Sequence, residues 1–191
     1  MGIRVIGVVG KIGSGKDEVL KYLHSRYHIP YLSTGDLVRR IAEYDGIEPT
    51  RENLEAISQE CFRKLGKGCF VKMVADEIVK KGWKVSGISG IRSPDDVKIL
   101  RKRFGTDFIL LRVDVGDPRL RFERLLLRHE ERDSATYEGF LTQDEDEEKV
   151  FQISKAGEKA DHLLKNDGPL AALHEQIDSL VKAKKLLQVQ K

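Results

Sequence analysis

The residues best suited to chemistry lie near the start of the chain, in the segment 10–17 with the sequence GKIGSGKD. This segment fits the phosphate-loop pattern G-x-x-x-x-G-K, except that Asp17 stands where serine or threonine is usual. The glycines Gly10, Gly13 and Gly15 allow the backbone to curl until several N–H groups point at one anion. The segment therefore predicts a cradle for the phosphates of a nucleotide.

Lys16 has the most direct chemical role in this loop. Its ammonium group is expected to reach the β- and γ-phosphates of ATP, while Ser14, Gly15 and the start of the next helix offer backbone N–H groups. The pattern requires a buried strand before the loop and a helix after it. The sequence predicts both, because residues 3–9 are mainly apolar and β-branched and residues 19–27 carry apolar side chains at helical spacing.

Asp17 breaks the pattern and admits two interpretations. A carboxylate is a suitable ligand for Mg²⁺, either directly or through a water molecule. A negative side chain in the first turn of a helix also stabilises that helix by roughly 0.3–1 kcal/mol without any metal. The sequence leaves both roles open, and Asp17 is the residue that it predicts as a metal ligand.

The elements that must position the loop alternate between strands and helices. Strands are expected at 3–9, 31–32, 83–88, 108–115 and 160–165. Helices are expected directly after the loop and at 36–44, 50–82 with a break at 66–68, 94–104, 118–132, 149–158 and 170–187. Residues 133–148 are acidic and poor in apolar side chains, which predicts an exposed segment. The alternation favours an α/β fold with a parallel sheet covered by helices on both faces.

Length and composition bound the kind of protein. The 191 residues suit one domain of ordinary size, and no linker or repeat interrupts them. With 40% hydrophobic and 34% charged residues the chain is neither a membrane protein nor a disordered one, and a net charge of +3 is too small for a nucleic-acid footprint. Cys61 and Cys69 form no C-x-x-C motif. We expect a cytoplasmic protein that binds neither nucleic acid nor membranes, and its oligomeric state is open.

The segment 31–39, with the sequence YLSTGDLVR, resembles the S-T-G-D-x-x-R segment of adenylate kinases and related nucleoside monophosphate kinases. It follows the phosphate loop in the order and spacing of that family. The resemblance implies that Thr34, Asp36 and Arg39 belong to the site of the acceptor nucleotide.

A second acceptor segment is similar to the family pattern Asp-Gly…Arg that follows the third strand. This chain has the sequence SGIR at 89–92. The resemblance implies that Arg92 holds the phosphate of the acceptor. Ser89 departs from the pattern, because it replaces a carboxylate that the family places near Mg²⁺.

The helix expected from Pro118 lies where nucleoside monophosphate kinases carry a mobile lid. Its arginines are spaced by three or four positions and so share one helix face: Arg121, Arg124, Arg128 and Arg132. The resemblance implies that arginines of this face bind the transferring phosphoryl group; which of the four reach it is open, and Arg128 and Arg132 are expected nearest the phosphate loop. The alternative is a solvated face neutralised by acidic residues, including Glu123 and those at 144–148.

The segment 160–168, with the sequence ADHLLKNDG, resembles the closing strand and turn of dephospho-CoA kinases and nucleotide kinases. This resemblance places Asn166, Asp167 and Gly168 at the adenine of ATP.

These resemblances make the chain similar to P-loop nucleoside monophosphate kinases of the adenylate kinase type. They imply a three-layer α/β/α P-loop kinase fold with a five-stranded parallel sheet, formed by a single domain over 1–191. An acceptor-binding helical region is expected at about 34–82 and a helical lid at about 117–148.

The implied activity is transfer of the γ-phosphate of ATP, with Mg²⁺, to a small phosphorylated acceptor, a nucleoside or deoxynucleoside monophosphate. Lys16, Arg92, Arg128 and Arg132 are then the catalytic residues. One alternative is dephospho-CoA kinase, although of that family's Asp-x-Asp only the second aspartate, Asp36, is present. Another is nucleotide binding without catalysis. A GTPase switch is disfavoured, because the chain has no D-x-x-G and no N-K-x-D motif.

Overall fold

The strands form one parallel sheet at the centre of the molecule. The computed structural model describes residues 2–128, 134–183 and 186–187. Its strands are β1 (Arg4–Val9), β2 (Tyr31–Ser33), β3 (Val85–Ser89), β4 (Phe108–Asp114) and β5 (His162–Lys165). Their order in the sheet is β2-β3-β1-β4-β5, and each neighbouring pair runs parallel. The prediction of an α/β fold with a five-stranded parallel sheet is confirmed.

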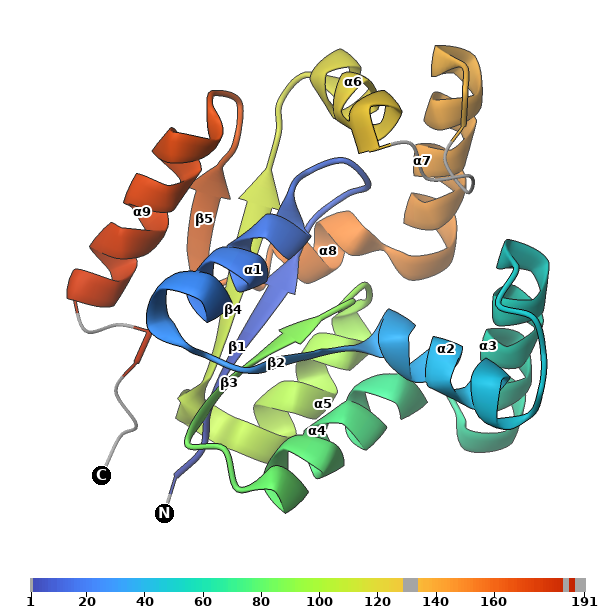
Figure 1. The fold of residues 1–191 in the computed structure, drawn as a ribbon, viewed down its shortest axis with the longest axis horizontal. Coiled ribbons are helices and arrows are strands. Elements are labelled where there is room, and N and C mark those ends of the chain that lie inside the picture. Colours follow the sequence, from blue (N-terminus) through green and yellow to red (C-terminus); the bar gives the residue numbers. More distant parts are fainter. Residues whose placement is uncertain (1, 129–133, 184–185, 188–191) are drawn as a thin grey trace.

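Helices cover both faces of the sheet and make three layers (Figure 1). One face carries α1 (Lys16–Tyr27) and α9 (Leu170–Lys182), and the other carries α4 (Cys69–Lys81), α5 (Pro94–Phe104) and the short α8 (Ile153–Gly157). Residues of β1 alternate between the two layers. Ile6 and Val8 pack with α1 and α9, whereas Val5 and Val9 pack with α4 and α5. The carboxyl end of β1 is thereby fixed between the layers, where the phosphate loop begins.

Two helices lie beside the sheet in the first part of the expected acceptor region at about 34–82: α2 (Thr34–Tyr44) and α3 (Arg51–Leu65) (Figure 1). The rest of that region is α4, which covers the sheet. The Ser33 hydroxyl caps α2, because it accepts hydrogen bonds from the backbone N–H groups of Gly35 and Asp36. The predicted break at 66–68 is confirmed, since α3 ends before Gly66 and α4 begins after Gly68.

The prediction of an exposed segment at 133–148 is wrong. The helix α7 (Tyr137–Phe151) occupies most of it and packs against α6 (Pro118–Arg128). Phe140 is fully buried in a small apolar cluster with Leu125 and Ile12. A few apolar side chains at helical spacing therefore order this helix, although most of its other residues are acidic.

Some predicted helix boundaries also differ. The helix expected at 149–158 is divided, because Gln152 adopts a left-handed backbone conformation (φ 56°) between the end of α7 and the start of α8. The last helix ends at Lys182 rather than 187, and Leu186 and Leu187 lie in a turn. The end of the predicted helix 118–132 lies outside the described residues.

None of the helices in the described part of the chain combines the length and the apolar composition needed to cross a membrane.

Candidate active site

The phosphate loop joins the end of β1 to the first residue of α1, beneath α6 (Figure 1). Gly13 (φ 74°) and Gly15 (φ 83°) adopt left-handed conformations, which glycine tolerates best. Neither position has room for a side chain: an added Cβ would lie 2.5 Å from the Arg121 carbonyl oxygen at Gly13 and 2.4 Å from Asn166 Nδ2 at Gly15. At Gly10 it would meet the Ser14 hydroxyl. The loop thus has the close-packed turn that its sequence predicts.

Side chains from distant parts of the chain hold the loop from outside. Asn166 Nδ2 donates to the Ser14 carbonyl at 2.9 Å, and Arg121 Nη1 donates to the Ile12 carbonyl at 3.1 Å. Both bonds use carbonyl oxygens and so occupy none of the loop N–H groups, although the Ser14 N–H itself donates to the Lys11 carbonyl at 3.1 Å. Asn166, which we predicted at the adenine of ATP, has this second role in shaping the loop.

The Lys16 ammonium lies among several charged groups at the start of α1. Burial lowers its pKa below the 10.5 usual for lysine, and the positive charges of Arg92 and Arg128 lower it further. Asp17 and Glu147 act in the opposite direction. The lysine therefore shares its site with two other cations, which is the arrangement expected of a site that receives a polyanion.

Asp17 accepts a hydrogen bond from the Ser89 hydroxyl at the end of β3. Loss of water around the carboxylate raises its pKa, but the charge of Lys16 and the Ser89 hydrogen bond outweigh this, and the pKa lies below its usual range. Asp17 is thus an anion at neutral pH.

A magnesium ion would fit oxygen donors such as these. The carboxylate and hydroxyl are ligand types that Mg²⁺ accepts, and this ion usually takes only one or two carboxylates from a protein and completes its shell with phosphates and water. Within the described residues, no three His, Cys, Asp or Glu side chains gather into a metal cluster. Any magnesium here would therefore depend on the nucleotide phosphates.

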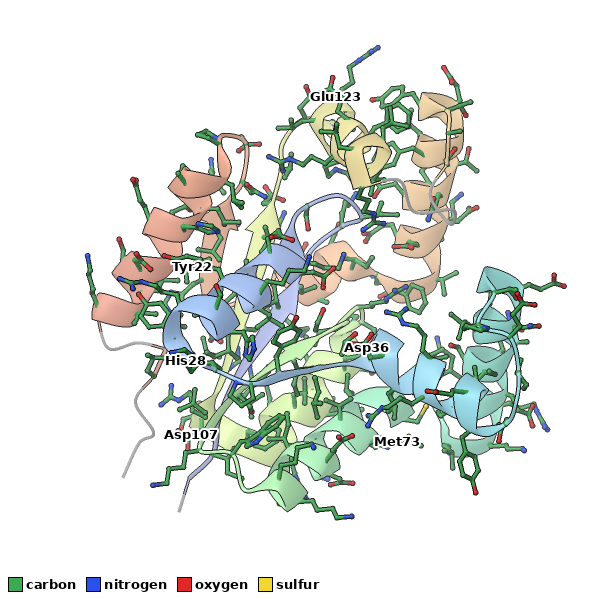
Figure 2. The ribbon with its side chains drawn as sticks, in the orientation of Figure 1. Tyr22, His28, Asp36, Met73, Asp107 and Glu123 are labelled. Carbon is green, nitrogen blue, oxygen red and sulfur yellow. The ribbon has the colours of Figure 1, made fainter. Side chains whose placement is uncertain are left out.

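The predicted acceptor residues lie at the ends of β2 and β3. Thr34 is buried and donates a hydrogen bond to the Gly90 carbonyl at 3.2 Å, so it fastens the two strand ends together. Asp36, labelled in Figure 2 at the first turn of α2, pairs with Arg39 at 2.8 Å. This pair is solvent-exposed and leaves the Arg39 side chain at the surface.

Arg92 is the predicted acceptor residue whose charge acts on Lys16 of the phosphate loop. Its backbone N–H donates to Asp96 at 3.1 Å, which fixes the turn after β3. Its guanidinium group lies 5.3 Å from the ring centre of Phe151 and has one nitrogen 4.0 Å from the Glu147 carboxylate. The side chain stays 44% exposed. Arg92 therefore presents a positive charge to solvent beside Lys16.

Two arginines of the α6 face, Arg121 and Arg124, bind other parts of the protein. Arg121 is buried and forms a bidentate ion pair with Asp144 at 2.7 and 2.8 Å. Arg124 donates to the carbonyl oxygens of Asn166 and Gly168. Both guanidinium groups are thus engaged with other parts of the protein in this structure. The neutralising acid is Asp144, since Glu123 lies on the exposed outer side of α6 (Figure 2).

Arg128 keeps the role that the sequence predicts open. It lies close enough to influence the pKa of both Lys16 and Asp17, although it is seven residues further along α6 than Arg121. Arg132 lies outside the described residues.

The turn after β5 is held in a fixed shape. Asp167 accepts a hydrogen bond from the Gly116 N–H at 2.7 Å, and Arg124 binds the carbonyl oxygens on either side. The side chains of Asn166 and Asp167 are thus engaged within the protein, as are the backbone N–H of Asn166 and the carbonyl oxygens of Asn166 and Gly168.

Sequence reasoning named Asp144 and Glu147, both on α7, only as members of the acidic run 144–148 and did not predict their individual partners. Asp144 joins Arg121 and also Lys11 of the loop, at 3.5 Å, while Glu147 faces Arg92. The spacing of Phe140 and Phe151 around them is the signal that could have revealed a helix with an inward face.

The chain matches a family model and is similar in sequence to curated proteins. Residues 9–140 match the family described as AAA domain. A UPF0200 protein of Thermococcus onnurineus (strain NA1) is 34% identical over 180 residues, covering 93% of this chain and 96% of the relative.

Solved kinase structures are similar in fold at low sequence identity. A shikimate kinase from Acinetobacter baumannii has a TM-score of 0.61 at 17% identity and covers 96% of each chain. A gluconokinase from Sinorhizobium meliloti 1021 has a TM-score of 0.57 at 15% identity and covers 95% of each chain. These neighbours show a P-loop kinase-like fold.

Proposed function

Because the chain belongs to the UPF0200 family and has the AAA-domain phosphate loop, we propose that it is an ATP-dependent small-molecule kinase. It transfers the γ-phosphoryl group of ATP to a phosphorylated acceptor, with a nucleoside monophosphate as the first candidate. The relatives carry no activity in their name, so the proposal depends on the geometry of this chain.

The observation that carries the proposal is the placement of Lys16 and Arg92 after the carboxyl ends of the neighbouring strands β1 and β3. Lys16 belongs to the loop that would bind the donor phosphates, and Arg92 follows the neighbouring strand β3. Their positive charges are close enough for Arg92 to lower the pKa of Lys16. A protein that only bound one nucleotide would have little need for a second exposed cation here, whereas a kinase must hold two anions in line.

A phosphate acceptor fits the site better than a hydroxyl acceptor. A hydroxyl must lose its proton during transfer and needs a general base, whereas a phosphate is already ionised near neutral pH. The aspartate expected as base in dephospho-CoA kinases is replaced by Thr34, whose hydroxyl is bonded to Gly90. Asp36 is paired with Arg39 at the surface. These contacts favour a monophosphate over dephospho-CoA.

In this mechanism the residues position groups and stabilise charge. The loop amides and Lys16 hold the β- and γ-phosphates, Arg92 and Arg39 hold the acceptor phosphate, and Arg128 approaches the transferring group from the lid. A magnesium ion held near Asp17 and Ser89 would neutralise charge on the donor phosphates. The loop carbonyls stay fixed by Asn166 and Arg121 throughout.

The test is a coupled phosphoryl-transfer assay with ATP and a panel of acceptors. The panel contains the nucleoside and deoxynucleoside monophosphates, dephospho-CoA, shikimate and gluconate. Turnover with a monophosphate that disappears in Lys16→Ala and persists in Lys72→Ala, an exposed lysine of α4, supports the proposal. Transfer to dephospho-CoA alone, or ATP binding without transfer to any member of the panel, would contradict it.

A further inference from the structure

One face of α7 contacts both halves of the candidate site. Asp144 pairs with Arg121 and Lys11 on the side of the phosphate loop. Glu147 lies one turn further along and pairs with Arg92 on the acceptor side. The helix therefore places one carboxylate on the side of the phosphate loop and one on the acceptor side.

The two contacts differ in strength. The Asp144–Arg121 pair is buried and bidentate at 2.7 and 2.8 Å, so it anchors α7. The Glu147–Arg92 pair has a single long contact of 4.0 Å between partly exposed side chains. An exposed single contact of this kind contributes little stability, and it can be exchanged for a better anion without unfolding the helix.

Phe151 also contacts Arg92. The guanidinium carbon lies 5.3 Å from the centre of its ring, one turn of α7 beyond Glu147. Because the ring contact does not use the N–H donors of Arg92, these donors remain for an anion, and Glu147 is the anion that lies beside them in the structure.

We propose that Glu147 is a specificity-determining residue: its carboxylate occupies the anion position of Arg92 until an acceptor phosphate displaces it. The proposal rests on the function proposed above, since it takes Arg92 as the residue that binds the acceptor. An acceptor must then bring more than one negative charge to this position. A phosphate carries up to two charges and three acceptor oxygens, whereas a carboxylate offers no more than Glu147 already does.

Two effects of Glu147 on phosphate binding oppose each other. The carboxylate helps to orient the Arg92 side chain, which would strengthen binding, and it repels the incoming phosphate, which weakens binding. Orientation by a single long, exposed contact is a small effect. Repulsion acts on both charges of a dianion at short range, next to a site from which the protein excludes part of the water. Repulsion is therefore the larger effect, and removal of the Glu147 charge tightens phosphate binding.

Displacement also has a consequence for the lid. When Glu147 leaves Arg92, α7 keeps its anchor at Asp144 but loses its only described ion pair with the acceptor side, within the residues that the structure covers. Acceptor binding thereby changes the contacts of α7, the helix that also pairs with Lys11 of the phosphate loop.

The experiment is a calorimetric titration with the best-binding nucleoside monophosphate and with the matching nucleoside, which lacks the phosphate. Glu147→Gln is compared with wild type and with Glu145→Gln, which removes the same charge from an exposed position of the same helix. We expect Glu147→Gln to lower the Kd of the monophosphate about fivefold, as loss of one weak ion pair implies, and to leave the Kd of the nucleoside unchanged. Glu145→Gln should change neither.

An Arg92→Gln background provides the second arm. There the effect of Glu147→Gln should vanish, because the anion position no longer exists. The proposal would be overturned if Glu147→Gln left the Kd of the monophosphate unchanged or raised it. It would also be overturned if the fivefold decrease in Kd persisted in the Arg92→Gln background. These are binding measurements, so a protein that binds monophosphates in this way but transfers no phosphate would refute only the kinase activity.

Discussion

The Ser89 hydroxyl donates a hydrogen bond to the Asp17 carboxylate across 72 positions of sequence. Both residues depart from the patterns that their segments resemble: the phosphate loop usually has a hydroxyl at position 17, and the related kinases have a carboxylate at position 89. The two functional groups have exchanged places. The site therefore keeps one hydroxyl and one carboxylate at the end of β3 and the start of α1, where Mg²⁺ would need them.

This exchange predicts how the protein responds to magnesium. Asp17→Asn should raise the Mg²⁺ concentration needed for half-maximal rate and lower kcat, because the amide is a poorer ligand for a hard cation. The double variant Asp17→Ser with Ser89→Asp restores the usual arrangement and should recover the wild-type Mg²⁺ midpoint. Magnesium titrations at fixed ATP measure both. If Asp17→Asn leaves the midpoint unchanged, Asp17 is a helix-end charge and not a ligand.

The pKa of Lys16 predicts a pH dependence of nucleotide binding. Burial and the neighbouring Arg92 and Arg128 favour the neutral amine, so the pKa is below 10.5, and only the ammonium form attracts phosphate strongly. The affinity for ADP should therefore fall as the pH rises through this lowered pKa. Arg92→Gln removes one positive charge and should shift that fall to higher pH. ADP binding curves across alkaline pH test this, and a shift to lower pH would contradict it.

Arg92 and Arg39 are expected to differ in their effect on the acceptor. Arg92→Ala should raise the acceptor KM about 10- to 100-fold, the loss expected for a charged hydrogen bond to phosphate, with little effect on the ATP KM. Arg39 is partly compensated by Asp36, so Arg39→Ala should have a smaller effect. Steady-state kinetics with each substrate varied in turn separates the two. An increase in the ATP KM alone would place Arg92 on the donor.

The arginines of α6 should separate into two classes. Arg128→Ala is expected to lower kcat with little change in Tm, because this exposed residue lies near Lys16 and acts on the transferring group. Arg121→Ala is expected to lower Tm, because it removes the buried partner of Asp144. Arg132 is predicted to resemble Arg128. Parallel measurements of kcat and thermal unfolding test the division, and equal loss of Tm in Arg128→Ala would reject it.

The buried pair also predicts a stability effect at Asp144. Asp144→Asn leaves the Arg121 charge buried without its counter-ion, which costs about 3–5 kcal/mol of unfolding free energy in comparable pairs. Replacing both partners by apolar residues, Arg121→Met with Asp144→Leu, should recover much of that loss. Denaturant unfolding of the three variants measures these changes. A double variant less stable than Asp144→Asn would show that the Arg121 hydrogen bond to Ile12 is the more important contact.

The sequence predicted the sheet and the phosphate loop because both depend on local patterns. The buried strand before the loop, the glycines with positive φ and the Ser33 cap are each determined by a few adjacent residues. An exposed segment was predicted where α7 lies because acidic residues dominate the composition there and outweighed the spacing of a few apolar ones. The helix is ordered by contacts with α6 and with Ile12. Ile12 is far away in sequence, and a contact with it has no local signal.

The same reason explains what was missed in the site. The spacing of the α6 arginines predicted that they share a helix face, but spacing does not tell which group each guanidinium binds. For Arg121 that group is Asp144, and for Arg124 it is a pair of carbonyl oxygens. Partners of this kind become visible only when α7 and the turn after β5 are placed in space.

Ile12 has a consequence for how this protein could be re-engineered. Its side chain belongs to the phosphate loop by sequence but to the cluster of Leu125 and Phe140 by packing. Replacing α6 and α7 alone with the corresponding helices of another protein would therefore disrupt packing, because the new helices would be shaped to fit a different loop residue. A chimera that folds would have to exchange residues 11 and 12 together with α6 and α7, so the segments that must be exchanged together are not contiguous in sequence.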